Sequence, residues 1–120
     1  MPPLRRGWRR SFVMDIKAWL EQAGEPAADT CFPEGGAPNL PYITFLDTAY
    51  HTGADIGNGI TKHSLTVERL CEDATDNQNL ESLLEAAGHW EKQRTYLPGP
   101  DNCYETIYTI EIMERTEING

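Results

Sequence analysis

A glycine-rich segment at residues 53–59 is the first place in this 120-residue sequence where chemistry could occur, because glycine loops can cradle phosphate groups. A phosphate cradle needs a helix N-terminus directly after the glycines, whereas both flanking segments alternate in the manner of strands. The sequence also contains no P-loop, dinucleotide-binding or nucleophile-elbow motif. We therefore interpret the segment as part of a hairpin tip and predict no cofactor.

Two histidine–carboxylate pairs could act as acid–base partners, namely His63 with Glu68 and Asp47 with His51. Neither pair is accompanied in the sequence by a positioned nucleophile, so we predict no enzyme activity and no catalytic residue. The three cysteines and three histidines show no C-x-x-C or H-x-x-x-H spacing, which argues against a metal site. An odd number of cysteines without a secretory signal indicates free thiols in a reducing compartment.

Charge is distributed unevenly along the chain and limits the partners it could bind. The net charge is −9, yet residues 1–13 contain four arginines and no acid. From Met14 onward there are six basic and nineteen acidic residues, a net of −13. A domain this acidic repels phosphate backbones, so we interpret its aromatic residues as cross-strand packing rather than base stacking.

The chain reads as one domain over residues 14–117, preceded by a basic segment at residues 1–13. This segment could be a disordered arm, an extension ahead of a natural start at Met14, or a tail that binds nucleic acid or a partner. It lacks the apolar core of a secretory signal, and no apolar run approaches the length of a membrane helix. The expected location is therefore the cytoplasm of the cell that makes the protein.

Hydrophobic periodicity predicts two short helices and a set of strands. Both helices have apolar residues at i, i+3, i+4 and i+7, with a closing glycine at Gly24 or Gly88, and the second has capping candidates in Asp76 and Asn77. Alternating β-branched and aromatic residues predict the strands. The expected order is helix 15–23, edge strand 30–32, strands 41–48 and 63–72, helix 80–87, and strands 90–97 and 104–115.

This element order predicts an α+β fold, a two-layer sandwich with a mostly antiparallel sheet of four to five strands and two helices on one face. The other sheet face would carry threonine and charged residues with scattered Ile, Leu and Met, and would be a place for oligomerisation. Between the first two long strands, residues 49–60 are too many for a tight hairpin turn. Long hairpin tips are often functional, so this tip is the first candidate site.

A longer pattern begins with Pro33-Glu-Gly-Gly-Ala-Pro-Asn-Leu-Pro-Tyr-Ile-Thr-Phe-Leu-Asp47. It continues with Gly53-Ala-Asp, His63-Ser-Leu-Thr-Val-Glu-Arg-Leu, a short leucine-rich helix and an aromatic end at residues 90–112. This pattern resembles small morphogenetic proteins in the head–tail gene modules of phages and prophages of Gram-positive bacteria. Within that group it most resembles the tail terminator, or tail completion, proteins of long-tailed phages, over residues 14–114.

The resemblance implies a structural protein of the virion tail, assembled in the bacterial cytoplasm, that forms a ring of typically six subunits on the tail tube. Such a ring ends tube polymerisation and prepares the head–tail junction. Its implied partners are other copies of itself, the tail-tube protein and head–tail connector proteins, while DNA passes through the lumen without specific binding. No membrane partner is implied.

The residues expected to touch a neighbouring subunit or partner fall in two places. The first is the long tip and the second lies beside the turn at residues 98–102. Together they comprise Tyr50, His51, Ile56, Ile60, Tyr96 and Leu97. Three other readings stay open: another head–tail connector or neck protein, an acidic non-enzymatic binding module such as a regulator or DNA mimic, and a small hydrolase without an assignable substrate.

Overall fold

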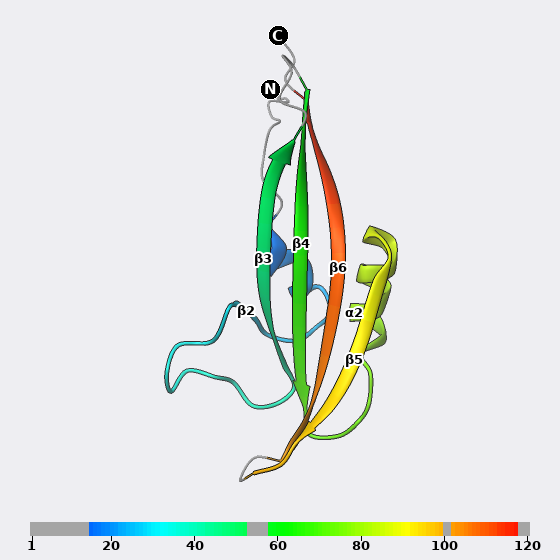
Figure 1. Cartoon of the computed structure of the whole chain (residues 1–120). Helices are drawn as coiled ribbons and strands as arrows, with labels where there is room; N and C mark the ends of the chain where they lie inside the picture. The colour runs from blue at the N-terminus through cyan, green and yellow to red at the C-terminus, as the bar shows by residue number, and fades with distance from the viewer. Residues whose placement is uncertain (1–14, 53–57, 100–101, 118–120) are drawn as a thin grey trace.

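A computed structural model describes residues 15–52, 58–99 and 102–117, and shows an α+β fold with a mostly antiparallel five-stranded sheet and two helices (Figure 1). The predicted fold class is therefore confirmed. The basic segment at residues 1–13 and the candidate residue Ile56 lie outside the described residues. The elements are α1 Ile16–Glu21, β2 Ala27–Asp29, β3 Tyr42–Thr52, β4 Asn58–Cys71, α2 Gln78–Ala87, β5 Trp90–Leu97 and β6 Cys103–Glu117.

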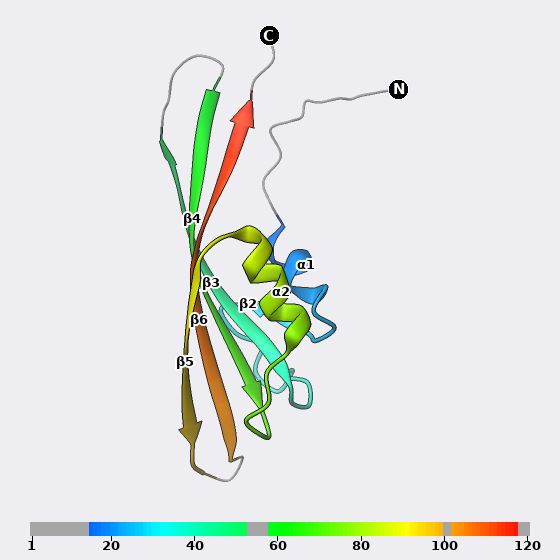
Figure 2. The same ribbon diagram turned by 90° about the vertical axis from the view of Figure 1, so that its right-hand side faces the viewer.

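The sheet has the strand order β2-β3-β4-β6-β5, in which only the β2–β3 pair is parallel. Both helices cover the same face of this sheet, as Figure 2 shows. Phe45, Val67 and Tyr108 lie side by side on that face across three neighbouring strands, and each is at most 5% exposed. Because alternate residues of a strand point to one face, these positions place the core between the sheet and the helices.

The two helices start and stop as their sequences predict. Asp15 caps α1, because its side chain accepts a hydrogen bond from the backbone N–H of Ala18, and Asn77 does the same for Leu80 in α2. Gly24 follows α1 with a φ of +89°, the left-handed conformation that glycine adopts without strain. α1 buries Ile16 and Leu20, and α2 buries Leu80 and Leu84.

The prediction of an edge strand at residues 30–32 is wrong, because the short strand β2 lies at Ala27–Asp29. Thr30 has a φ of +67°, which ends the extended conformation immediately before the predicted strand. Ala27 is 2% exposed and Ala28 is 9% exposed, so burial of two small residues, rather than strand propensity, positions β2.

The predicted long tip at residues 49–60 is also corrected, because β3 extends to Thr52 and β4 begins at Asn58. Backbone pairing continues from Ala49 opposite His63 to Thr52 opposite Ile60. β6 pairs with the other side of β4 along the same stretch, so β4 is paired on both sides there. This second partner extends the strands through threonine- and glycine-rich sequence that resembles a loop when it is read alone.

Asn77→Ala tests how α2 is held. The Asn77 side chain accepts from the N–H of Leu80 at 3.0 Å and donates to the carbonyl of Ala23 at 3.1 Å, so it caps α2 and ties it to the end of α1. We expect the substitution to lower the free energy of unfolding by about 1–2 kcal/mol in urea titrations. Asn79→Ala, at an exposed position in the first turn, is the control; equal losses for both variants would contradict this role.

Candidate functional site

Three strands of the sheet project beyond both helices and form a structure that we call the ribbon (Figure 2). We define the ribbon as residues 49–52 of β3, 58–63 of β4 and 112–117 of β6, which pair continuously with one another. A small sheet segment without a helix cover gains little from burial of apolar side chains. At the base of the ribbon, Ile112 is 6% exposed and belongs to the hydrophobic core, and polar contacts join the three strands there as well.

His63 lies in β4 at the base of the ribbon, is 1% exposed, and bridges the two outer strands. Its Nδ1 lies 2.9 Å from Oδ2 of Asp47 in β3, and its Nε2 lies 2.9 Å from Oε1 of Glu114 in β6. Burial by itself lowers the pKa of this imidazole, but hydrogen bonds and charges from Glu114 and Asp47 outweigh burial and raise it. The charged imidazole can then donate one hydrogen bond to each carboxylate.

This arrangement differs from both acid–base pairs that the sequence suggested. His63 pairs with Asp47 and Glu114, whereas Glu68 lies on the opposite sheet face because it is an odd number of residues away on the same strand. With both ring nitrogens bound to carboxylates, the imidazole has no free nitrogen to accept a proton from a substrate. The chemistry that this cluster offers is electrostatic cross-linking of three strands.

Two other buried polar clusters fasten the helix layer to the sheet. Arg69 is 5% exposed and binds the carboxylate of Glu25 through Nε and Nη2 at 2.9 and 2.8 Å, while Nη1 donates to the carbonyl of Thr75. The hydrogen bond that Arg69 donates to the carboxylate of Glu25 is the main cause that raises the pKa of Arg69. Tyr108 donates from its hydroxyl to Oε2 of Glu81 in α2 at 2.7 Å, and burial is the main cause that raises the pKa of Tyr108.

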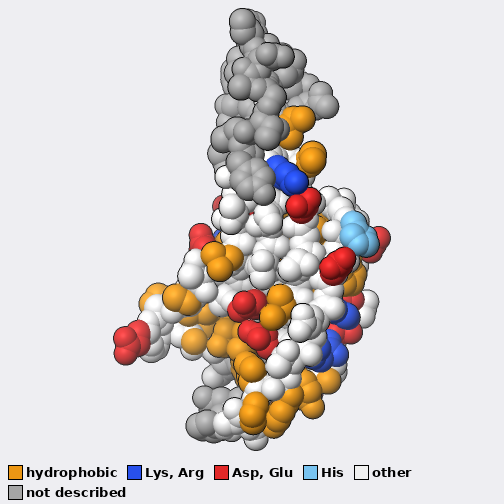
Figure 3. Space-filling model, in the orientation of Figure 1, with side chains coloured by type: hydrophobic (Ala, Val, Ile, Leu, Met, Phe, Trp, Pro, Cys, Tyr) orange, Lys and Arg blue, Asp and Glu red, His pale blue; other side chains and the backbone are white. Residues whose placement is uncertain are grey.

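The sheet face away from the helices, which we call the open face, combines exposed apolar side chains with carboxylates. Leu46 is 55% exposed and Met113 is 67% exposed, and both lie on this face because they are out of phase with the core residues. Glu68 and Glu105 lie close together there, and burial, followed by the charge of Glu68, raises the pKa of Glu105. Figure 3 views this face and shows apolar side chains gathered toward its lower end, among acidic ones.

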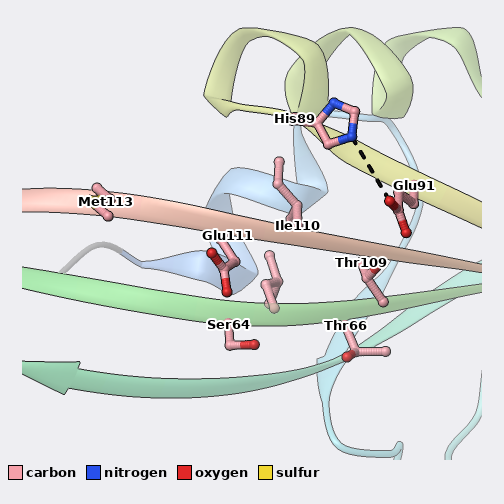
Figure 4. A pocket seen from close by; sticks show the side chains of 9 residues that line it. Ser64, Thr66, His89, Glu91, Thr109, Ile110, Glu111 and Met113 are labelled. Atoms are coloured by element: carbon pink, nitrogen blue, oxygen red, sulfur yellow. Dashed lines mark ion pairs between the residues drawn. The ribbon is translucent and has the colours of Figure 1, made fainter.

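A shallow groove crosses the open face between β4, β6 and the start of β5 (Figure 4). His89 and Glu91 lie at its rim, 4.0 Å apart, and both are largely exposed. In the part of the chain that the structure describes, no hydroxyl of the groove is hydrogen-bonded to a histidine, as an activated nucleophile would be. The lining of the groove comprises Ser64, Leu65, Thr66, His89, Glu91, Thr109, Ile110, Glu111 and Met113.

The candidate contact residues separate into two groups at opposite ends of the sheet. Tyr50 and His51 lie in β3 of the ribbon, and half-buried Ile60 lies in β4, between Thr52 and Arg115 of the flanking strands. The other group comprises Tyr96, which is 47% exposed with its ring 5.1 Å from that of Tyr104, and the half-buried Leu97.

Sequence reasoning missed the cluster of Asp47, His63 and Glu114. The available signal was the position of His63, which falls in phase with the apolar residues Leu65 and Val67 and is therefore on the buried face. A buried histidine needs hydrogen-bond partners. Identifying the partners required the strand register, because Glu114 is 51 residues away in the sequence.

Comparison with known proteins adds no relative to this description. No protein-family model matches the sequence, and no curated protein shows significant similarity to it. Among the described residues, no helix is long and apolar enough to cross a membrane.

His63→Gln tests the electrostatic clasp at the base of the ribbon. The substitution leaves two mostly buried carboxylates without a cation, so we expect it to lower the free energy of unfolding by on the order of 3 kcal/mol near pH 6. The pKa of His63 is raised in the folded state. Its contribution to the free energy of unfolding is therefore complete below the unfolded pKa of about 6.5 and is lost as pH rises through the folded pKa.

Urea unfolding across this pH window measures both effects. The difference between wild type and His63→Gln should shrink as pH rises, while His89→Gln, at a side chain that is 89% exposed, should show no such trend. A difference that is independent of pH would contradict the charged clasp.

Proposed function

We propose that this protein is a structural, non-enzymatic phage morphogenesis protein that closes into an oligomeric ring, caps the tail tube and prepares the head–tail junction. The observation that carries the proposal is the uneven cover of the sheet. Both helices cover one face of the central part of the sheet, while the other face and the projecting ribbon carry exposed apolar side chains. This is the arrangement of a subunit that completes its burial by assembly. It agrees with the resemblance to tail terminator proteins.

A ring places specific demands on its subunit. Head-to-tail contacts require two different surfaces on one molecule, related by a rotation that closes. The ribbon with Tyr50, His51 and Ile60 at one end, and the patch of Tyr96 and Leu97 at the other, are two such surfaces. Exposed Leu46 and Met113 add apolar contact area on the open face.

The acidic charge suits a ring through which DNA passes. With a net charge of −9, the subunit contributes carboxylates such as Glu68, Glu91 and Glu105 to its open face. Carboxylates that line a channel repel the phosphate backbone, so DNA moves through without being held. In this proposal the protein functions in the virion tail after assembly in the host cytoplasm, with the tail-tube protein and connector proteins as neighbours.

The same charge favours a second function, an acidic binding module that mimics DNA and occupies a basic host protein. The two functions differ in stoichiometry and in salt dependence. A mimic would remain a monomer or dimer and bind its basic partner with strong salt dependence, whereas a ring subunit would assemble with copies of itself. A connector or neck protein would share the ring and differ only in its neighbours.

Leu46→Glu tests the contact role of the open face. An exposed leucine at a protein contact becomes a buried charge in the variant, so we expect the fraction of purified tail tubes that are capped to fall about tenfold or more. Electron microscopy of tube ends measures that fraction. Ser82→Glu introduces the same charge on the exposed side of α2 and should cap as wild type does. Equal capping by both variants would overturn the proposed contact.

A further inference from the structure

The outer edge of β3 is unpaired along most of its length among the described residues. β2 pairs with β3 only at residues 43–45, which leaves residues 46–52 with a free edge. Ile43 donates its N–H outward to Pro26, and the carbonyl of Phe45 accepts from Thr30, so odd-numbered residues of β3 direct their backbone groups outward. By this alternation, the N–H and C=O groups of Asp47, Ala49 and His51 face the free edge.

The outer edge of β6 is free in the same part of the sheet. β5 pairs with β6 only as far as Ile110, and Gly88 packs against the carbonyl of Glu111, so the free edge comprises residues 112–117 in the described part of the chain. Even-numbered residues of β3 form backbone hydrogen bonds with even-numbered residues of β4. The odd-numbered residues of β4 are then left to bond to β6, where the register places them opposite even-numbered residues. Met113, Arg115 and Glu117 therefore direct their backbone groups outward.

Neither edge contains the proline, lysine or glycine that often marks a blocked edge strand, although the β6 edge carries Glu114, Arg115 and Glu117 and the β3 edge carries the inward-directed Asp47. The acid on the β3 edge, Asp47, is directed to His63 within the sheet and is 21% exposed. Strand edges of this length that lack a partner are templates on which another strand can pair.

The two edges are matched in a way that selects a partner. They lie on opposite sides of one ribbon at the same level, because Ala49, His63 and Ile112 pair across it. β3 and β6 are both antiparallel to β4 and therefore run in the same direction. A β6 edge of one copy can thus receive the β3 edge of the next copy as a parallel neighbour, and the same contact repeats around a ring.

We propose that copies of this chain associate through their ribbons, with the β6 edge at residues 112–117 of one copy pairing in parallel with the β3 edge at residues 46–52 of the next. The alternative, two β6 edges meeting about a two-fold axis, brings their glutamates at 111, 114 and 117 together and costs repulsion. This inference deepens the proposed function by naming the contact between subunits, and it rests on the proposed function for its closed ring.

A cysteine cross-linking experiment tests the pairing directly. Thr48 and Met113 are both exposed on the open face, one beside each edge, and a short bis-maleimide reagent can join them between copies. The exposed Cys31 is first replaced by serine, while Cys71 and Cys103 are buried. The double variant Thr48→Cys, Met113→Cys should give a ladder of trimers and larger species, because each copy has both ends of the contact.

The single-cysteine variants are the matched controls, and each should give no more than traces of dimer. Efficient dimers from one single variant, with the double variant ending at dimers, would overturn the proposal in favour of like-edge pairing. The proposal is also overturned if the double variant gives no cross-links at the highest concentration tested.

Ala49→Pro then tests the backbone hydrogen bonds. Proline removes an outward N–H that pairs with no strand among the described residues, so circular dichroism and thermal unfolding should remain close to wild type. Species larger than dimer should fall at least about tenfold in the cross-linking background, whereas Ala49→Ser should retain them. An undiminished ladder with Ala49→Pro would contradict edge pairing.

The proposed function and the proposed edge pairing can be contradicted independently of each other. A full ladder from protein that never caps tail tubes overturns the proposed function and leaves the pairing supported. Normal capping by Ala49→Pro overturns the pairing and leaves the proposed function supported.

Discussion

The charged imidazole of His63 is the interaction on which the part of the sheet beyond the helices depends. It lies where helix cover ends, and it joins β3, β4 and β6 through one carboxylate on each side. Removing one partner of such a buried ionic cluster is strongly destabilising, because it leaves the remaining charges without compensation.

The rest of the molecule makes the ribbon a rigid extension of a well-packed body. The bidentate contact between Arg69 and Glu25 fixes the segment after α1, and the hydrogen bond between Tyr108 and Glu81 fixes α2. Both helices therefore hold one face of the sheet firmly, while the open face and two strand edges remain without partners among the described residues. In the proposed function, assembly covers the surfaces that the described residues of a single subunit leave exposed.

Much of the fold could be predicted because its signals are local. The apolar spacing of Leu80 and Leu84, the cap at Asn77 and the stop at Gly24 each depend on a few neighbouring residues, and the structure has all of them in place. The lengths of the strands could not be predicted from local signals. Residues 58–62 pair with β6, more than fifty residues away in the sequence, and residues 49–52 pair with β4 in turn; no local pattern reveals these partners.

The candidate site was predictable to the same extent. Tyr50, His51 and Ile60 were selected as members of a protruding segment, and the ribbon does protrude, although as strands rather than as a loop. The partners of His63 were not predictable, because they depend on the register of three strands. β2 was misplaced because two buried alanines have little strand propensity of their own.

Mass measured by light scattering across protein concentration and salt, with and without tail-tube protein from the same phage or prophage, is the most direct test of the central claim. The account predicts a closed oligomer of several subunits, either free in solution or bound at tube ends. A protein that remains a monomer at every concentration and also ignores the tube would contradict the account, and would favour the acidic binding module instead.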